Sequence, residues 1–259
     1  LHSGFGTFGT YLVTVIPYLL VAIFHVRQTS YRLIFSLLLA LNFFCIYITF
    51  SRGTWVAAAV LPFLIGWRLL PGRVILISVG LAALGLFLLV PKGIIWHKIS
   101  IPGPGAPGGV IETADARWEL TKFSVEKIKE NPFQMLGFGR RSFVKKYEDF
   151  YLKYKGALIW HAHNTFLDLT FQTGVQGLVI FCFFLYRVLK YCYEGARRSE
   201  SPLGKFYWGA TFLMIITFFV RNLSDDFFVD DSALLFWFLC GAALGMKEGS
   251  CSPHEGSCR

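Results

Sequence analysis

The segment from Leu33 to Phe50 reads LIFSLLLALNFFCIYITF and contains no charged side chain. A helix of this length rises about 27 Å, close to the roughly 30 Å of hydrocarbon in a bilayer. Other apolar stretches lie at Phe8–Val26, Thr54–Leu70, Val74–Val90, Gly174–Tyr193, Phe206–Val220 and Ser232–Met246. Backbone polar groups must be paired inside lipid, so these spans are expected to be helices. The sequence therefore predicts an all-α, polytopic transmembrane bundle.

Composition and span positions divide the chain into four segments. The 259 residues are 54% hydrophobic, more than a soluble domain of this size needs. We expect about four spans in residues 1–90, a large, partly helical loop in 91–173, about three spans in 174–246 and a tail in 247–259. The first residue is Leu1, so the chain is expected to be the C-terminal part of a longer protein.

The basic residues of the short connections predict the orientation of the chain. They fall on alternate turns, at Arg27 and Arg32, Arg68 and Arg73, and Arg187, Lys190, Arg197, Arg198 and Lys205. Short loops rich in Lys and Arg mark the cytoplasmic side, whereas long loops cross the membrane largely regardless of charge. The long loop is therefore expected outside. Arg52, and Arg221 with Asp225 and Asp226, would share that outer face, where the arginines either serve a site or snorkel to headgroups.

The predicted outer loop contains several features that suit anions or membrane surfaces. After a Pro/Gly-rich run at 101–109, Trp118, Phe123, Val125 and Ile128 are compatible with one face of a helix that ends at Asn131-Pro132. The run LGFGRRSF, residues 136–143, joins two glycines to Arg140 and Arg141, which suits an anion or a simple turn. The following segment interleaves Lys145, Lys146, Lys153 and Lys155 with aromatic residues. Headgroups, a lipid diphosphate or a sugar stacking on the aromatic rings fit it better than nucleic acid does, and a plain interfacial helix is the alternative.

His163-Asn164 stands where this polar segment ends and an apolar span begins. Histidine is the side chain best suited to accept a proton near neutral pH, although an interfacial anchor is an equal alternative. His161 precedes it by two residues, and on a helix the two side chains would point about 200° apart. In the tail, Cys251, His254 and Cys258 are a weak signal for a metal site, and a disordered tail is the alternative.

Several of these motifs together resemble the O-antigen ligase and O-antigen polymerase superfamily. Ser51-Arg52-Gly53-Thr54-Trp55 looks like its Ser-Arg-x-x-Trp signature, and Arg117-Trp118 is similar to a motif of its large periplasmic loop. His163-Asn164, nine residues and then Gly174-x-x-Gly177 match the His motif of the ligase branch.

The resemblance implies a GT-C-like membrane glycosyltransferase of the bacterial inner membrane, with its active site facing the periplasm. Its donor would be a glycan on undecaprenyl diphosphate, its acceptor a sugar of the lipid A core, and it would need no metal or other cofactor. Carried over, Arg52 and Arg117 bind the diphosphate and His163 is the catalytic base. An acidic residue near the last span also matters in the family, and Asp225 or Asp226 is its nearest match. Asn164, Arg140, Arg141, His161 and Arg221 are candidate supporting residues.

Two kinds of alternative function remain, one among related glycosyltransferases and one among membrane transporters. An O-antigen polymerase or a protein O-oligosaccharyltransferase would use the same donor with a glycan or a Ser/Thr side chain as acceptor. A transporter of an anion or a lipid-linked solute would place ionisable groups at mid-span and show inverted repeats. Here the spans are almost uncharged and the charged groups gather toward one face, which favours chemistry at the membrane surface.

Overall fold

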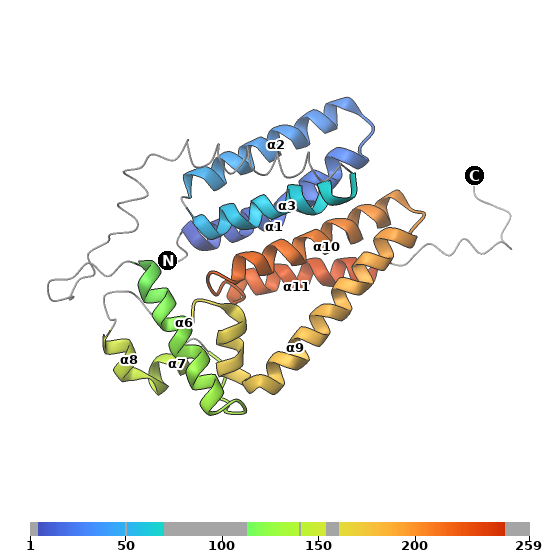
Figure 1. The fold of residues 1–259 in the computed structure, drawn as a ribbon. Coiled ribbons are helices and arrows are strands. Elements are labelled where there is room, and N and C mark those ends of the chain that lie inside the picture. Colours follow the sequence, from blue (N-terminus) through green and yellow to red (C-terminus); the bar gives the residue numbers. More distant parts are fainter. Residues whose placement is uncertain (1–4, 50, 70–112, 140, 154–160, 247–259) are drawn as a thin grey trace, which may run out of the picture. The chain divides into compact units, whose positions relative to one another are not determined.

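A computed structural model describes residues 5–49, 51–69, 113–139, 141–153 and 161–246, and within these ranges the regular structure is α-helical (Figure 1). The helices are α1 Phe5–His25, α2 Thr29–Ile48, α3 Arg52–Leu69, α6 Thr113–Glu130, α7 Arg141–Lys146, α8 Glu148–Lys153, α9 Thr165–Arg198, α10 Pro202–Asn222 and α11 Asp230–Gly245. The predicted all-α class is confirmed.

Four of the described helices are long and apolar enough to cross a membrane, at Gly6–His25, Thr29–Ile48, Thr165–Arg198 and Pro202–Asn222. They confirm a polytopic helical membrane protein. α3 and α11 occupy two more of the predicted spans, but the 16 residues of α11 rise only about 24 Å, less than the hydrocarbon thickness. The predicted span Val74–Val90 lies outside the described residues.

The chain divides into two compact units. The first comprises Leu1–Leu61, Leu185–Phe219 and Val229–Arg259, and the second comprises Pro62–Phe184 and Val220–Phe228. In the first unit, small polar groups join the apolar helices. Asn42 Nδ2 of α2 donates to Leu12 O of α1 at 3.3 Å, and Tyr18 OH of α1 lies 2.9 Å from Thr211 Oγ1 of α10. Such hydrogen bonds between helices help membrane bundles associate, because burial from water contributes little there.

The Ser-Arg-x-x-Trp stretch forms the corner between α2 and α3. Trp55 Nε1 donates to Ile46 O at 3.1 Å, and the Trp55 ring stacks on Tyr47 with an interplanar angle of 8°. Thr54 Oγ1 donates to Ser51 Oγ at 2.9 Å across the same corner. Two of the motif residues therefore fix the first turn of α3, the helix that begins at Arg52.

The second unit is built around an apolar cluster of Leu120, Phe143, Ala162 and Phe171. Phe123 of α6 and Phe150 of α8 stack against this cluster with ring centroids 4.0 Å apart. The helix that the sequence predicted up to Glu130 is present as α6. Only two of the four residues predicted to share one face of this helix pack inward, however. Phe123 and Ile128 pack inward, whereas Trp118 and Val125 are exposed. These two are seven residues apart and share a face turned well away from Phe123.

α9 contains a break that the sequence does not reveal directly. Gly174 has φ 72° and ψ 174°, so the helical hydrogen-bond ladder stops there. The segment after α6 forms hydrogen bonds with the backbone groups that lose their helical partners at the break. Leu136 N donates to Phe171 O at 2.9 Å, and Val175 N donates to Pro132 O at 2.9 Å. Only glycine adopts this backbone conformation readily, which gives the first glycine of the His motif a structural role.

Candidate active site

The residues His161, Ala162 and His163 lie on a non-helical turn just before α9. The Ala162 side chain enters the apolar cluster and is 1% exposed, while the two His rings lie together with centroids 4.3 Å apart. The divergence expected for a helix is therefore wrong for these residues, because α9 begins only at Thr165. The two imidazole rings therefore lie next to each other.

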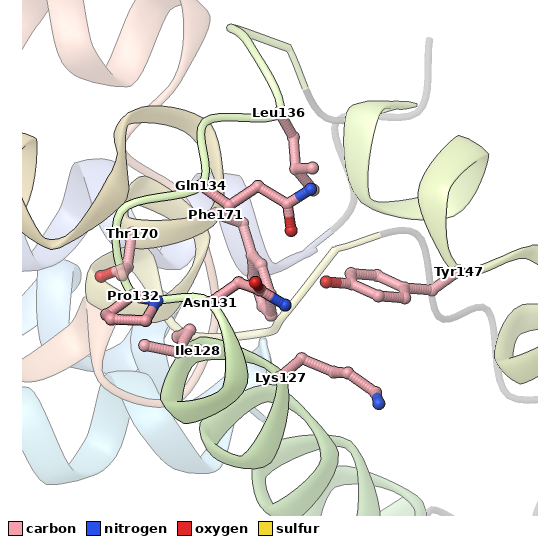
Figure 2. A pocket seen from close by; sticks show the side chains of 9 residues that line it. All are labelled: Lys127, Ile128, Asn131, Pro132, Gln134, Leu136, Tyr147, Thr170 and Phe171. Atoms are coloured by element: carbon pink, nitrogen blue, oxygen red, sulfur yellow. The ribbon is translucent and has the colours of Figure 1, made fainter.

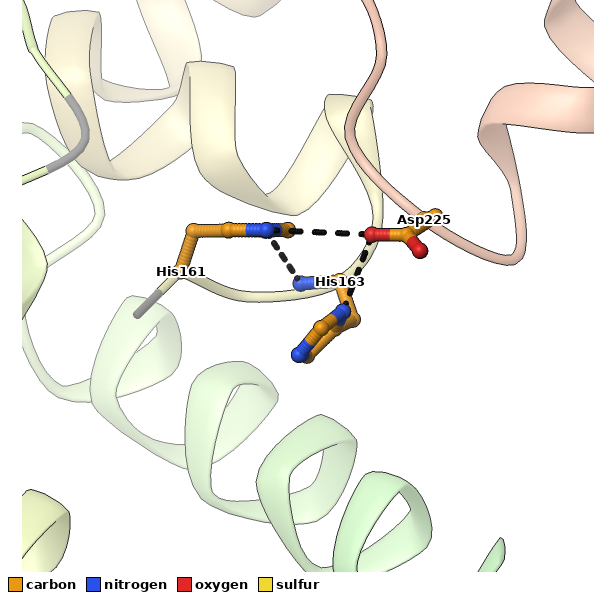
Figure 3. A group of neighbouring side chains, drawn as sticks. All are labelled: His161, His163 and Asp225. Atoms are coloured by element: carbon orange, nitrogen blue, oxygen red, sulfur yellow. Dashed lines mark hydrogen bonds and ion pairs between the residues drawn. The ribbon is translucent and has the colours of Figure 1, made fainter. Parts of the chain in front are cut away.

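The carboxylate of Asp225 lies beside both imidazole rings (Figure 3). Its Oδ1 atom lies 2.9 Å from His163 Nδ1 and 3.7 Å from His161 Nε2. All three side chains are largely buried, with 16% of His163, 9% of His161 and 17% of Asp225 exposed. One carboxylate oxygen therefore lies within reach of a ring nitrogen from each histidine.

The hydrogen bonds assign a tautomer to each ring. His163 N donates to His161 Nδ1 at 3.1 Å, so a neutral His161 carries its hydrogen on Nε2, toward Asp225. His163 presents Nδ1 to the carboxylate, so its own hydrogen belongs on Nδ1. The lone pair of His163 is then on Nε2. This is the arrangement that a histidine general base requires, with one nitrogen oriented by an acid and the other free to accept a proton.

The backbone at His163 is held in an uncommon conformation. Its φ angle is +49°, in the left-handed region that non-glycine residues rarely enter. Asn164 stabilises this turn as the N-cap of α9, since its Oδ1 accepts hydrogen bonds from Phe166 N at 2.9 Å and Leu167 N at 3.2 Å. Its Nδ2 donates to Leu223 O at 3.1 Å. Asn164 therefore joins the His turn to the segment that presents Asp225.

Asp226 has a different role from its neighbour. It is 3% exposed, and its Oδ1 lies 2.8 Å from Thr165 Oγ1. The same hydroxyl lies 2.8 Å from Asn222 Oδ1, and its single hydrogen serves one acceptor at a time. Sequence reasoning left Asp225 and Asp226 open and missed Thr165 and Asn222. The structure puts Asp225 on the histidines and Asp226 in the buried network behind them.

Asp168 is a further residue that sequence reasoning missed. It is 3% exposed, and its Oδ1 accepts a hydrogen bond from Ala162 N at 3.4 Å while its Oδ2 accepts one from Gln172 Nε2 at 2.7 Å. The carboxylate thus ties the His turn to the first half of α9. Its position four residues after Asn164, at the start of an apolar span, was the available signal.

Arg221 is buried rather than extended toward solvent. It is 3% exposed, its guanidinium lies 4.3 Å from the centre of the Phe227 ring, and its Nη1 donates to Ser224 Oγ at 3.0 Å. These contacts disagree with the snorkelling alternative. They stabilise the turn that carries Asp225.

The other predicted arginines are placed less completely. Arg52 begins α3, Arg117 lies in the second turn of α6 and Arg141 begins α7, but their side chains are outside the described part of the structure. Arg140 lies outside the described residues altogether. Gly137 and Gly139 have φ angles of +86° and +116°, as an exposed turn requires.

A small hollow lies elsewhere in the same unit (Figure 2). Its lining includes Lys127, Asn131, Gln134, Tyr147 and Thr170. Burial raises the pKa of the Tyr147 phenol, and the nearby Lys127 ammonium partly opposes that rise. None of the predicted site residues lines this hollow, so it is not part of the His163 site.

The His161, His163 and Asp225 cluster has enough ligand atoms to consider a metal ion. One ligand atom from each residue lies within 4.8 Å of the others. Two imidazoles and a carboxylate are also the donor set of several catalytic zinc sites. Among the described residues this cluster is the place where a metal would fit. The tail cluster predicted at Cys251, His254 and Cys258 lies outside them.

Comparison with known proteins decides the family. The model of the O-antigen ligase family matches residues 35–182, more than half of the chain. The chain belongs to the O-antigen ligase family. The match contains the corner at Arg52, the Arg117 helix and the His motif, but it ends before Asp225.

A relative in Salmonella typhimurium, described as an O-antigen ligase, is 26% identical over 159 residues. The alignment covers 59% of this chain and 38% of that relative, so the chain spans well under half of the relative's length. The resemblance to the O-antigen ligase superfamily, which the motifs predicted, is thus confirmed. The long apolar helices among the described residues give this family member its membrane character.

Proposed function

We propose that this chain carries the reacting groups of a glycosyltransferase that moves a glycan from undecaprenyl diphosphate to a sugar of the lipid A core. The reaction would take place at the periplasmic face of the bacterial inner membrane. The observation that supports it best is the His163–Asp225 pair, which orients an imidazole with Nε2 available as a base. The family match supports the class of reaction.

In the proposed step, the acceptor hydroxyl oxygen attacks the anomeric carbon of the donor sugar. The bond from that carbon to the phosphate oxygen breaks, and undecaprenyl diphosphate leaves with the electron pair. The hydroxyl proton goes to His163 Nε2, and Asp225 stabilises the imidazolium that forms. One direct displacement inverts the anomeric centre.

Arg52 and Arg117 are proposed to bind the diphosphate. A leaving diphosphate needs fixed positive charge, and guanidinium groups supply it with bidentate hydrogen bonds. Arg52 begins a helix, and the first backbone N–H groups of a helix attract the same anion. Arg140 and Arg141 remain candidates for supporting contacts, because they follow exposed turn glycines.

Donor binding separates these roles from that of His163. In the full-length protein, Arg52→Ala and Arg117→Ala should each weaken binding of a fluorescent undecaprenyl diphosphate glycan by about tenfold or more, because a hydrogen-bonded charge contributes roughly 1.5–3 kcal/mol. His163→Ala should leave this binding unchanged. Lys129→Ala, at an exposed position near the end of α6, is the control for lost positive charge. Unchanged donor binding in both arginine variants would overturn the proposal that Arg52 and Arg117 bind the diphosphate.

The acceptor is proposed from the family description, and the alternative acceptors can be compared in one assay. Lipid A core, a free glycan repeat and a Ser/Thr peptide are offered separately with the same donor. Transfer to lipid A core supports a ligase. Transfer only to the glycan or only to the peptide would replace it with a polymerase or a protein O-oligosaccharyltransferase.

A further inference from the structure

The segment Pro132–Gly139, between α6 and α7, exposes large apolar side chains to an unusual degree. Phe133 is 71% exposed, Met135 is 66% exposed and Phe138 is 85% exposed. Leu136 of the same segment packs against the apolar cluster instead. The segment is therefore anchored on one side and turns apolar groups outward on the other. Concentrated exposed apolar surface of this kind marks an interaction site.

This apolar segment is attached to a predicted membrane span at the point where the span begins. Leu136 and Gly137 donate to Phe171 and Gln172 before the break in α9, and Val175 after the break donates to Pro132. Gln176 Nε2 also donates to Phe133 O at 3.4 Å. The segment thus lies beside the first turn of the apolar half of α9.

The same face of α9 is exposed further along the helix. Gln176 is followed at helical spacing by Val179, Ile180 and Phe183, which are 60%, 68% and 62% exposed. α9 is long and apolar enough to cross a membrane, so this stripe suits contact with lipid. Phe133 lies next to Gln176, at the N-terminal end of the stripe. The apolar segment and the exposed stripe of the span therefore adjoin at Gln176.

Positive charge follows the apolar segment directly. Arg140 and Arg141 come next in the sequence, and Lys145 and Lys146 are exposed on α7. α7 is held to the segment, since Ser142 Oγ donates to Gly137 O at 3.0 Å. Aromatic and aliphatic side chains beside basic residues are the combination found in segments that lie at the interface of anionic bilayers.

We propose that Pro132–Gly139 inserts Phe133, Met135 and Phe138 into the phospholipid at the membrane face where the apolar half of α9 begins. The occupant of this surface is the phospholipid of the same bilayer that α9 crosses. The insertion would also position the candidate active site relative to the membrane. Leu136 packs against the cluster that contains Phe171 and Ala162, so the insertion would hold the His161–His163 turn at a fixed height above the lipid. The proposal does not depend on the transfer chemistry.

Photocrosslinking in the full-length protein tests this contact. p-Benzoylphenylalanine replaces Phe138 or Phe133, and the protein is placed in nanodiscs of phosphatidylethanolamine and phosphatidylglycerol. Phe183, on the exposed stripe of α9, gives the positive reference. Trp118 is the matched control, because it is an aromatic residue of the same unit and is 60% exposed, but it lies on α6 away from the segment.

After irradiation, intact-mass spectrometry should find phospholipid adducts at positions 138 and 133 at least fivefold above position 118. Adducts at 138 and 133 no more frequent than at 118 would overturn the proposal. Crosslinks from these positions to another part of the polypeptide, in place of lipid, would overturn it as well.

Discussion

Asp225→Asn tests how much the carboxylate beside His163 contributes to the proposed reaction. The substitution keeps the size of the side chain and an oxygen that can accept the Nδ1 hydrogen bond, which is 2.9 Å long in the structure. It removes the negative charge. A hydrogen bond to a charged partner contributes roughly 1.5–3 kcal/mol, and a neutral one about 0.5–1.5 kcal/mol. The expected loss is therefore about 1–2 kcal/mol of stabilisation of the imidazolium that forms when His163 accepts the proton.

In rate terms, that loss corresponds to a fall in kcat of about 5- to 30-fold, because each 1.36 kcal/mol is a factor of ten. The assay is steady-state transfer from a lipid diphosphate glycan to purified lipid A core. KM for the donor should change little, since the interaction strengthens only as the proton moves. Asp231→Asn, at an exposed position in the first turn of α11, controls for lost charge and should be neutral. An Asp225→Asn enzyme with unchanged kcat would refute the assigned role.

Three further outcomes follow from the same geometry. Gly174→Ala should destabilise the protein by about 1–3 kcal/mol, because a Cβ at φ 72° is strained and meets the Gln176 amide. Gly241→Ala, where the structure leaves open space, should not lower the thermal midpoint in detergent, and equal midpoints for both variants would contradict the strain. Thr165→Val should lower stability by about 1–3 kcal/mol by removing a hydroxyl partner of buried Asp226, and an unchanged midpoint would argue against that network. Transfer should continue in EDTA, and a loss that zinc restores would show that the His cluster holds a metal instead.

The sequence predicts the general architecture well because its signals are local. Uncharged runs such as Leu33–Phe50 specify membrane helices by length and hydropathy alone, and α2 occupies that run. The helix up to Glu130 is likewise predicted by its spacing and by Asn131-Pro132. Its buried face is predicted less well, because the exposure of Trp118 depends on what α7 and α9 place beside α6.

The site is predicted only where one motif contains it. His163 stands out from its motif, but its partner Asp225 is 62 residues away, and only the path of the Arg221–Phe227 turn distinguishes it from Asp226. The divergence expected between His161 and His163 is wrong for a related reason. The relation of His161 to His163 depends on where α9 begins, and a difference of a few residues in a helix start decides whether two side chains converge.

His163→Ala in an in-vitro transfer assay tests the central claim most directly. The full-length protein, a synthetic undecaprenyl diphosphate glycan and purified lipid A core are incubated with EDTA, and product is followed by mass spectrometry. Removal of the base should lower kcat by about 100-fold or more while donor binding persists, because general base catalysis contributes roughly 10²–10⁴-fold. Transfer at the wild-type rate by the His163→Ala enzyme would contradict the account.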